Sequence, residues 1–195
     1  WVTLALLIFL GMVGFYDDYR KLVRGSSEGL PGRYKLLCQI VIAFVIGYYL
    51  FTELSFSTVL NIPFFKDVHP DLGWVYIIFI LLVIVGTSNA VNLTDGLDGL
   101  ATGPIIMSFA TYAVLAYIAG HSKIAGYLQI PYQPGVGELA VFCGAVVGAC
   151  IGFLWFNTYP ADIFMGDVGS LSLGGALGLT AVLTKNEILL VVIGG

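Results

Sequence analysis

The chain of 195 residues is 58% hydrophobic and 10% charged, with a formal net charge of −4 at pH 7. Together with a mean hydropathy of +0.95, these values exclude a soluble domain of ordinary composition and predict a protein that crosses the lipid bilayer several times. Five of the eight Lys and Arg residues fall in one predicted loop, and no basic stripe interleaved with aromatic residues exists. The sequence therefore predicts no nucleic-acid partner.

The apolar runs predict an all-α, polytopic bundle of six or seven transmembrane helices. A bilayer-spanning helix needs about 20 mostly apolar residues. Segments that approach this length are, in chain order, 1–16, 36–52, 74–91, 100–119, 138–156, 170–184 and 187–195. Because the first and last segments begin and stop inside apolar runs, we expect residues 1–195 to be a single transmembrane catalytic domain, truncated at both ends.

Alternation of these helices predicts which connections share a side of the membrane. Connections 17–35, 92–99 and 157–169 would lie on one side, and 53–73, 120–137 and 185–186 on the other. The first connection carries five basic residues, Arg20, Lys21, Arg24, Arg33 and Lys35, whereas those opposite carry one each, Lys66, Lys123 and Lys185. The positive-inside bias makes the first side cytoplasmic. Six aspartates fall on it: Asp17, Asp18, Asp95, Asp98, Asp162 and Asp167.

The first acidic motif is Asp17–Asp18, where the first helix is expected to leave the membrane. Its aromatic and basic neighbours, such as Tyr16 and Arg20, are typical of a belt that anchors a helix end at the interface. Two adjacent carboxylates at a helix C-terminus are different, because the helix dipole disfavours negative charge there. We therefore expect Asp17 and Asp18 to hold a cation or to take up a proton.

The second motif covers residues 87–101, directly after an apolar run. Asn89, Asn92, Asp95 and Asp98 recur at every third position, which predicts a drifting stripe on one helical face. Such groups at the end of a membrane segment need a metal, a phosphate or water as a partner. The alternative is a simple cap for the helix that begins near Gly99. A calcium-binding loop does not fit, because alternating oxygen ligands are missing.

The third motif covers residues 155–170 and precedes a Gly-rich apolar helix. One interpretation is a loop broken by Pro160, with Asp167 or Ser170 as the next helix cap. The other is a metal-binding Asp167 at a helix N-terminus, where backbone N–H groups and the helix dipole favour a phosphate. The lysine of a Walker loop is missing. Asp162 is interpreted as a surface residue.

Together the three motifs predict a phosphate and metal site. Carboxylates with Asn and Thr oxygens, and neither Cys nor His nearby, favour a hard cation such as Mg2+. Lys21, Arg33 and Lys35 supply complementary charge for phosphate oxygens. A cytoplasmic site of this kind on a membrane protein indicates phosphoryl transfer between a soluble nucleotide and a lipid.

The chain resembles the polyprenyl-phosphate N-acetylhexosamine-1-phosphate transferases. The resemblance is carried by F-Y-D-D-Y-R-K at 15–21, N-A-V-N-L-T-D-G-L-D-G-L-A at 89–101 and F-N-T-Y-P-A-D-I-F-M-G-D-V-G-S at 156–170. Segments 131–142 and 29–35 favour the branch that uses the muramoyl-pentapeptide precursor. This implies Mg2+-dependent transfer of phospho-N-acetylmuramoyl-pentapeptide from the UDP-linked precursor to undecaprenyl phosphate in the bacterial plasma (inner) membrane. The products would be lipid I and UMP, in peptidoglycan synthesis.

The resemblance also implies roles for matching residues. Asp167 would be the metal ligand, while Asp17 and Asp18 would lie beside the lipid phosphate, with Asp17 favoured to position or deprotonate it. Lys21 and Lys35 would face phosphate oxygens. The nucleotide and diphosphate pocket would be shaped by Asn92, Asp95, Asp98 and Asn157. The family's amino-terminal helices and its later His-rich motif are not in this chain, and a homodimer remains open.

Two other functions remain as alternatives. A sister transferase would move N-acetylglucosamine-1-phosphate from its UDP-linked donor to undecaprenyl phosphate. An ion or proton transporter would also place acids in membrane segments, although near the middle of helices rather than at their ends on one side.

Overall fold

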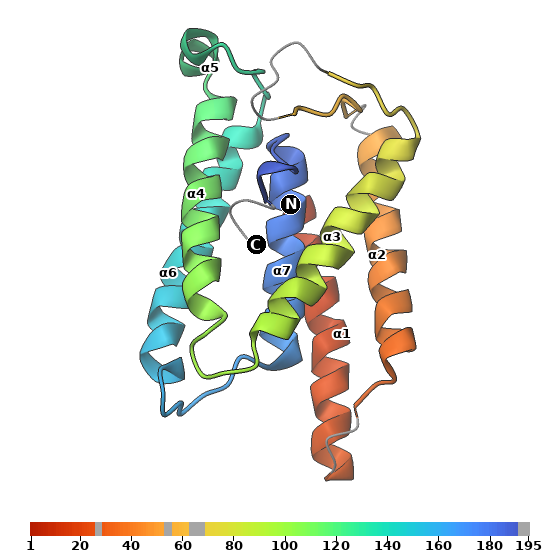
Figure 1. Ribbon diagram of the computed structural model, residues 1–195, viewed down its shortest axis with the longest axis vertical. Helices are drawn as coiled ribbons and strands as arrows, with labels where there is room; N and C mark the ends of the chain where they lie inside the picture. The colour runs from red at the N-terminus through yellow and green to blue at the C-terminus, as the bar shows by residue number, and fades with distance from the viewer. Residues whose placement is uncertain (26–28, 53–55, 63–68, 191–195) are drawn as a thin grey trace.

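The computed structural model describes residues 1–25, 29–52, 56–62 and 69–190 (Figure 1). Within them, six helices are long and apolar enough to span a membrane. These are α1 (Val2–Arg24), α2 (Gly32–Thr52), α3 (Val75–Thr94), α4 (Thr102–Gly120), α6 (Leu139–Asn157) and α7 (Gly166–Leu183). A short helix, α5 (Ser122–Leu128), and a 3-10 turn, η1 (Val136–Glu138), connect α4 to α6. The predicted all-α, polytopic bundle is confirmed, and the chain is a multi-pass membrane protein.

One helix boundary differs from the sequence prediction in a way that changes the site. α1 continues past Asp17 and Asp18 and ends at Arg24, and the capping residue Gly25 adopts the left-handed conformation with φ 57°. Lys21 forms an ion pair with Asp17 one turn away, at 2.6 Å, and this neutralisation lets the helix continue. The expectation that the two aspartates lie at a helix C-terminus was therefore wrong. The predicted segment 187–195 lies partly outside the described residues, because 191–195 are not among them.

The helices alternate in direction, as predicted. In Figure 1 the connections α1–α2, α3–α4 and α6–α7 all lie at the lower end of the bundle. The connections α2–α3 and α4–α6 lie at the opposite end. All three acidic motifs are therefore brought to the same end, although they are far apart in the sequence.

α7 is the central helix of the bundle. Of its membrane-length window 67% is buried, against 17–33% for the other five helices. Its glycines permit close contact with the neighbouring helices. A Cβ at Gly174 would lie 2.6 Å from the carbonyl oxygen of Thr87 on α3, and one at Gly175 would overlap Leu10 on α1. Close packing of α7 between α1 and α3 places the N-terminus of α7 next to the acidic motif of α1.

Candidate active site

Asp17 lies on the side of α1 that faces Gly29 and Leu30, which follow this helix in the sequence. Its side chain is fully buried, whereas that of Asp18 is partly exposed. Asp17 Oδ1 accepts a hydrogen bond of 2.7 Å from the N–H of Leu30, so the chain folds back over this carboxylate. Gly29 leaves room for it, since a Cβ there would lie 2.5 Å from Asp17 Oδ1. The local fold thus fixes one oxygen of Asp17 and leaves the other for charged partners.

Two glycines bring α1 against the beginning of α7. A Cβ at Gly14 would overlap the carbonyl oxygen of Asp167 and lie 2.6 Å from the nitrogen of Val168. Gly166 begins α7 with φ 62°, and a Cβ there would lie 2.8 Å from Asp18 Oδ2. In this close contact Asp18 Oδ2 accepts a hydrogen bond of 3.2 Å from the N–H of Val168. Asp18 on α1 thereby caps the N-terminus of α7, because the N–H group that it accepts from has no acceptor within the first turn of that helix.

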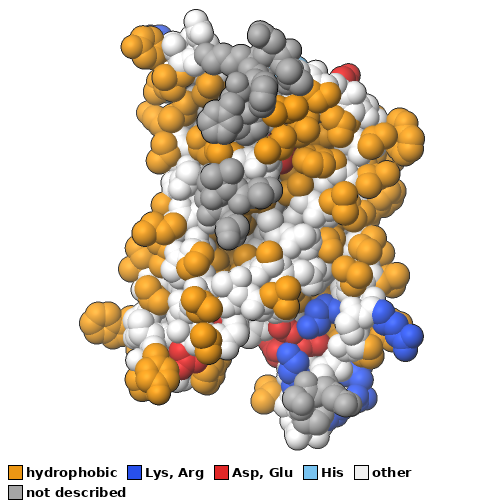
Figure 2. All heavy atoms as spheres, viewed as in Figure 1, with side chains coloured by type: hydrophobic (Ala, Val, Ile, Leu, Met, Phe, Trp, Pro, Cys, Tyr) orange, Lys and Arg blue, Asp and Glu red, His pale blue; other side chains and the backbone are white. Residues whose placement is uncertain are grey.

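Two lysine side chains join the carboxylates of α1 to that of α7. Lys21 Nζ lies 2.6 Å from Asp17 Oδ2 and 3.0 Å from Asp18 Oδ1. It also lies 3.0 Å from Asp167 Oδ2. Lys35 Nζ, from α2, lies 2.6 Å from Asp167 Oδ2 and 3.4 Å from Asp17 Oδ2. Figure 2 shows acidic and basic side chains gathered at this lower end of the molecule, where α1 and α2 meet.

Asn92 on α3 completes the surroundings of Asp167. Asn92 Nδ2 lies 2.5 Å from Asp167 Oδ1 and 2.8 Å from Ser170 Oγ. The Ser170 hydroxyl in turn donates a hydrogen bond of 2.8 Å to the carbonyl of Gly166. The sequence suggested only a capping role for Ser170. Its place three residues after Asp167 on one helical face is the signal that could have assigned it to this cluster.

The predicted stripe of residues 89, 92, 95 and 98 does not form. Asn89 Nδ2 lies 2.5 Å from Gln39 Oε1 on α2, whereas Asn92 points to α7. α3 ends before Asp95, so Asp95 and Asp98 are not on this helix. A helix that packs between two others presents successive polar residues to different neighbours, and this divides the stripe.

Asp95 lies close enough to the cluster for its charge to be affected. Burial raises the pKa of Asp95 to about 6, and the negative charges of Asp167 and Asp18 add to this rise. The backbone N–H of Gly166 opposes it. At neutral pH Asp95 therefore exchanges a proton more readily than an ordinary aspartate does.

The hydrogen bonds of Asn157 and Asp98 link two connections of the bundle, α3–α4 and α6–α7, and do not involve the cluster of Asp17, Asp18 and Asp167. Asn157 is buried, and its Oδ1 accepts hydrogen bonds from the N–H of Gly99 (3.1 Å) and the hydroxyl of Thr102 (3.0 Å). Its Nδ2 donates to the carbonyl of Ile163 at 2.9 Å. Asp98 Oδ2 accepts a hydrogen bond from the N–H of residue 161 at 3.1 Å. Connection α3–α4 is thereby fixed to connection α6–α7, while Asp162 is exposed.

The three carboxylates suit a divalent cation. One oxygen each of Asp17, Asp18 and Asp167 can be chosen so that all three lie within 4.8 Å of one another. They are hard oxygen donors, the ligand type that Mg2+ prefers. Oxygens of these three carboxylates already surround the ammonium group of Lys21, so their arrangement is one that accommodates positive charge. The residues present therefore fit the predicted metal.

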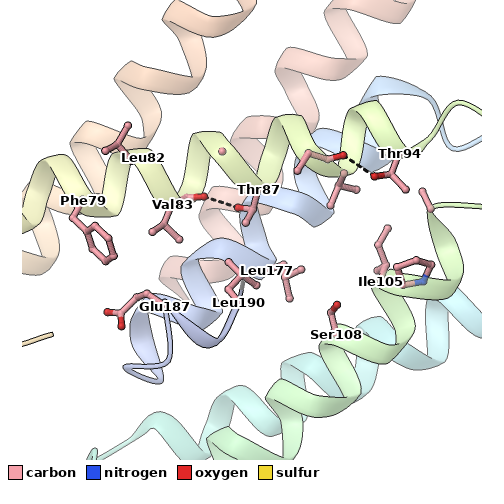
Figure 3. Close-up of a pocket in the computed structure, with 15 residues that line it drawn as sticks. Phe79, Leu82, Val83, Thr87, Thr94, Ile105, Ser108, Leu177, Glu187 and Leu190 are labelled. Carbon is pink, nitrogen blue, oxygen red and sulfur yellow. Dashed lines mark hydrogen bonds between the residues drawn. The ribbon is translucent and has the colours of Figure 1, made fainter. Parts of the chain in front are cut away.

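A separate apolar cavity of about 400 Å³ lies between α3, α4 and α7 (Figure 3). Thr94 lies at its end nearest the carboxylates, and Glu187 lies toward the opposite end of the bundle. The hydroxyls of Thr87 and Thr94 donate to carbonyls of their own helix, at Val83 and Ala90, so they offer little to a polar ligand. This lining suits hydrocarbon and not a nucleotide.

A buried polar cluster that the sequence pattern did not predict lies at the end of the bundle opposite the carboxylates. Lys185, just after α7, is buried, and its Nζ donates to the hydroxyl of Tyr76 at 2.9 Å and to the carbonyl of Ser57. The hydroxyl of Tyr76 donates to Glu187 Oε1. Burial lowers the pKa of Lys185 to about 8 and raises that of Glu187. A lysine and a glutamate two residues apart between apolar runs were the available signal.

Comparisons with known proteins give one consistent result. The family described as Glycosyl transferase family 4 matches residues 1–185. The chain is similar to proteins named phospho-N-acetylmuramoyl-pentapeptide-transferase from Citrifermentans bemidjiense (61% identical), Geobacter sp. strain M21 (60%) and Oleidesulfovibrio alaskensis (58%). Each similarity covers 100% of this chain and 54% of the relative. The chain thus spans about half the length of these curated relatives.

Proposed function

Because the chain belongs to Glycosyl transferase family 4, we propose that it forms the membrane-embedded catalytic region of an enzyme that transfers a phospho-sugar from a uridine nucleotide to a polyprenyl phosphate. One observation carries this proposal. Asp17 and Asp18 from α1 and Asp167 from α7 converge with Lys21 and Lys35 at one end of six membrane-length helices. Charges of both signs at a membrane boundary suit a reaction between a soluble diphosphate and a lipid phosphate.

The specific substrates that we propose are UDP-N-acetylmuramoyl-pentapeptide and undecaprenyl phosphate. Products would be lipid I and UMP, in the membrane step of peptidoglycan synthesis. Support comes from the names of relatives that are 58–61% identical over the whole chain. The sister reaction with UDP-N-acetylglucosamine uses the same chemistry, so only a substrate comparison separates the two.

We propose that Asp167 would hold a Mg2+ ion, with Asp17 and Asp18 as further carboxylates beside it. The ion would supply neutralisation of charge on the diphosphate during transfer. Asn92 holds Asp167 Oδ1 at 2.5 Å and so orients this carboxylate. A ligand that is already oriented loses little conformational freedom when it binds the metal.

The chain's own residues would act mainly by position and charge. A phosphate monoester with a second pKa near 6 is mostly dianionic at pH 7, so the lipid phosphate needs no strong base. Asp17, whose Oδ1 is fixed by Leu30, would position the lipid phosphate. Lys21 and Lys35 would contact phosphate oxygens and stabilise the charge that develops on the leaving UMP. The pocket for the nucleotide would be shaped by Asn92 and Asp95, with Asp98 and Asn157 holding its loops.

We place this end of the bundle on the cytoplasmic side of the bacterial inner membrane. Lys21, Lys35 and three arginines lie at or beside the α1–α2 connection, in agreement with the positive-inside bias. A uridine nucleotide would approach from this side. The hydrocarbon chain of the lipid would lie along the membrane-facing helices, where the apolar cavity between α3 and α4 offers a suitable surface.

UMP release by the full-length protein tests the proposal. Purified protein in detergent would be given undecaprenyl phosphate, Mg2+ and either UDP-N-acetylmuramoyl-pentapeptide or UDP-N-acetylglucosamine. We expect release only with the muramoyl nucleotide. Release only with N-acetylglucosamine would assign the protein to the sister reaction, and release with neither would favour the transporter alternative.

A further inference from the structure

Lys21 and Lys35 occupy the position among the carboxylates that a cation would take. Lys21 Nζ lies within 3.0 Å of oxygens from all three aspartates, Asp17, Asp18 and Asp167. Lys35 Nζ contacts two of the same oxygens, Asp17 Oδ2 and Asp167 Oδ2. A divalent ion placed among these oxygens would lie at contact distance from an ammonium group of like charge. The lysines and a divalent ion therefore compete for the same ligands.

The charges in this cluster predict how the competition is decided. Three carboxylates and two ammonium groups leave one net negative charge in a site whose side chains are at most about one third exposed. Adding a divalent cation alone would leave one net positive charge, and adding a doubly charged diphosphate alone would leave three negative charges. Adding both returns the site to one negative charge. In a partly buried site such imbalances are costly, so metal and anion favour each other's binding.

We propose that Lys21 and Lys35 are resident cations that hold the metal site in its binding geometry and keep metal affinity low until a phosphate-bearing ligand draws their ammonium groups away. The inference rests on the proposed function for the identity of the metal and of the anion. Each lysine then exchanges carboxylate oxygens for phosphate oxygens, and the released oxygens become available to Mg2+. By linkage, metal and nucleotide increase each other's affinity by the same factor.

Metal binding by the full-length protein tests this inference without turnover. Mn2+, which accepts the same oxygen ligands and is detected by electron paramagnetic resonance, would be titrated into wild type, Lys21→Gln and Lys35→Gln without nucleotide. We expect each variant to bind Mn2+ about tenfold more tightly than wild type, because a competing charge at contact distance has been removed. Saturating UMP should raise the affinity of wild type, and should raise that of either variant less.

Arg24→Gln is the matched control. It removes a positive charge from the exposed end of α1, where the carboxylates are not contacted by this side chain in the part of the chain that the structure describes. We expect unchanged Mn2+ affinity. If Arg24→Gln increased Mn2+ affinity as much as the lysine variants do, the increase would come from overall surface charge, and the inference would be overturned. The two lysines come from different helices, so the test remains if one variant does not fold.

A purely supporting role of the lysines gives the opposite sign. If they only hold the carboxylates together, both variants will bind Mn2+ more weakly than wild type, or equally, and the inference is overturned. The result is also separate from the proposed function. Tighter Mn2+ binding in a protein that releases no UMP would keep the inference and remove the function, whereas UMP release without tighter binding would do the reverse.

Discussion

Lys35 on α2 and Asp167 on α7 are 132 residues apart in the sequence, and their charged atoms lie 2.6 Å apart. This ion pair fixes one oxygen of Asp167, while Asn92 fixes the other at 2.5 Å. With Lys21 of α1 also in contact, Asp167 is held by partners from three helices at the N-terminus of a fourth, where the helix dipole favours its negative charge. Its carboxylate is the natural centre of the proposed metal site.

Asp167→Asn in the full-length protein should abolish Mg2+-dependent UMP release while leaving the fold intact. Asn has the same shape but no charge, so the packing of α7 is kept and the metal ligand is lost. We expect a loss of about 1000-fold in the rate of UMP release, comparable to removal of a charge-stabilising group in other enzymes. Circular dichroism and thermal unfolding would monitor the fold. Near-normal activity would remove the metal assignment.

Gly14→Ala should disrupt the contact between α1 and α7. The added Cβ would overlap the backbone of Asp167, so the two helices would have to move apart, and Asp18 would lose its hydrogen bond to Val168. We expect destabilisation of about 1–3 kcal/mol, together with reduced activity.

Gly11→Ala, one turn earlier, is the control for this variant. Its Cβ would lie 3.8 Å from that of Ser172, which is an ordinary contact. Thermal unfolding and UMP release should therefore be close to wild type. Equal behaviour of the two variants would contradict the proposed close contact at Gly14.

Asn157→Asp should loosen the connection between the two loops. The carboxylate keeps the acceptor for Gly99 and Thr102 but cannot donate to the carbonyl of Ile163, which would then face a negative charge. We expect a loss of about 1–3 kcal/mol in stability, the usual consequence of a buried unpaired acceptor. Because these loops belong to the proposed nucleotide pocket, the KM for the uridine nucleotide should rise more than that for the lipid. An equal rise in both values would contradict the assignment of Asn157 to the nucleotide pocket.

Single cysteines introduced into a cysteine-free background would test the orientation of the bundle. Leu97 is exposed in the α3–α4 connection, and Ser122 is exposed at the beginning of α5. In right-side-out membrane vesicles, a membrane-impermeant maleimide should label Ser122→Cys and leave Leu97→Cys unmodified until the membrane is permeabilised. The reverse pattern would place the carboxylates outside and exclude a cytoplasmic nucleotide site.

Stability should depend on pH through Lys185. Its pKa is lowered from the ordinary 10.5 to about 8, mainly by burial, with Glu187 and Asp71 opposing the change. Between pH 8 and pH 10.5 the unfolded chain binds more protons at this residue than the folded chain does, so its contribution to the free energy of unfolding increases as pH rises. The raised pKa of Glu187 acts at lower pH and in the opposite direction.

Thermal unfolding of wild type and Lys185→Met from pH 7.5 to pH 10 would measure this contribution. The variant should show a smaller gain in unfolding temperature with pH than wild type. Lys123→Met, at an exposed lysine of α5, should behave as wild type. An equal pH dependence in all three proteins would contradict the burial of Lys185.

The class of fold and the clustering of the acidic motifs at one end of the bundle follow from the sequence. Apolar runs of membrane length allow little besides helices, because a backbone in lipid must satisfy its own hydrogen bonds. Alternation of six such helices then places Asp17, Asp95 and Asp167 at one end. The oxygen-rich composition of the three motifs also sufficed to predict a hard metal ion.

Which of these residues meet depends on how the helices pack. A helical stripe cannot reveal that Asn89 faces Gln39 whereas Asn92 faces Asp167, because each contact depends on which neighbouring helix approaches that turn. The close approach of α1 and α7 depends on Gly14, because a side chain at this position would overlap the backbone of Asp167. Likewise, Lys21 and Lys35 converge on the carboxylates because packing brings three helices together, and no spacing along the chain encodes that distance.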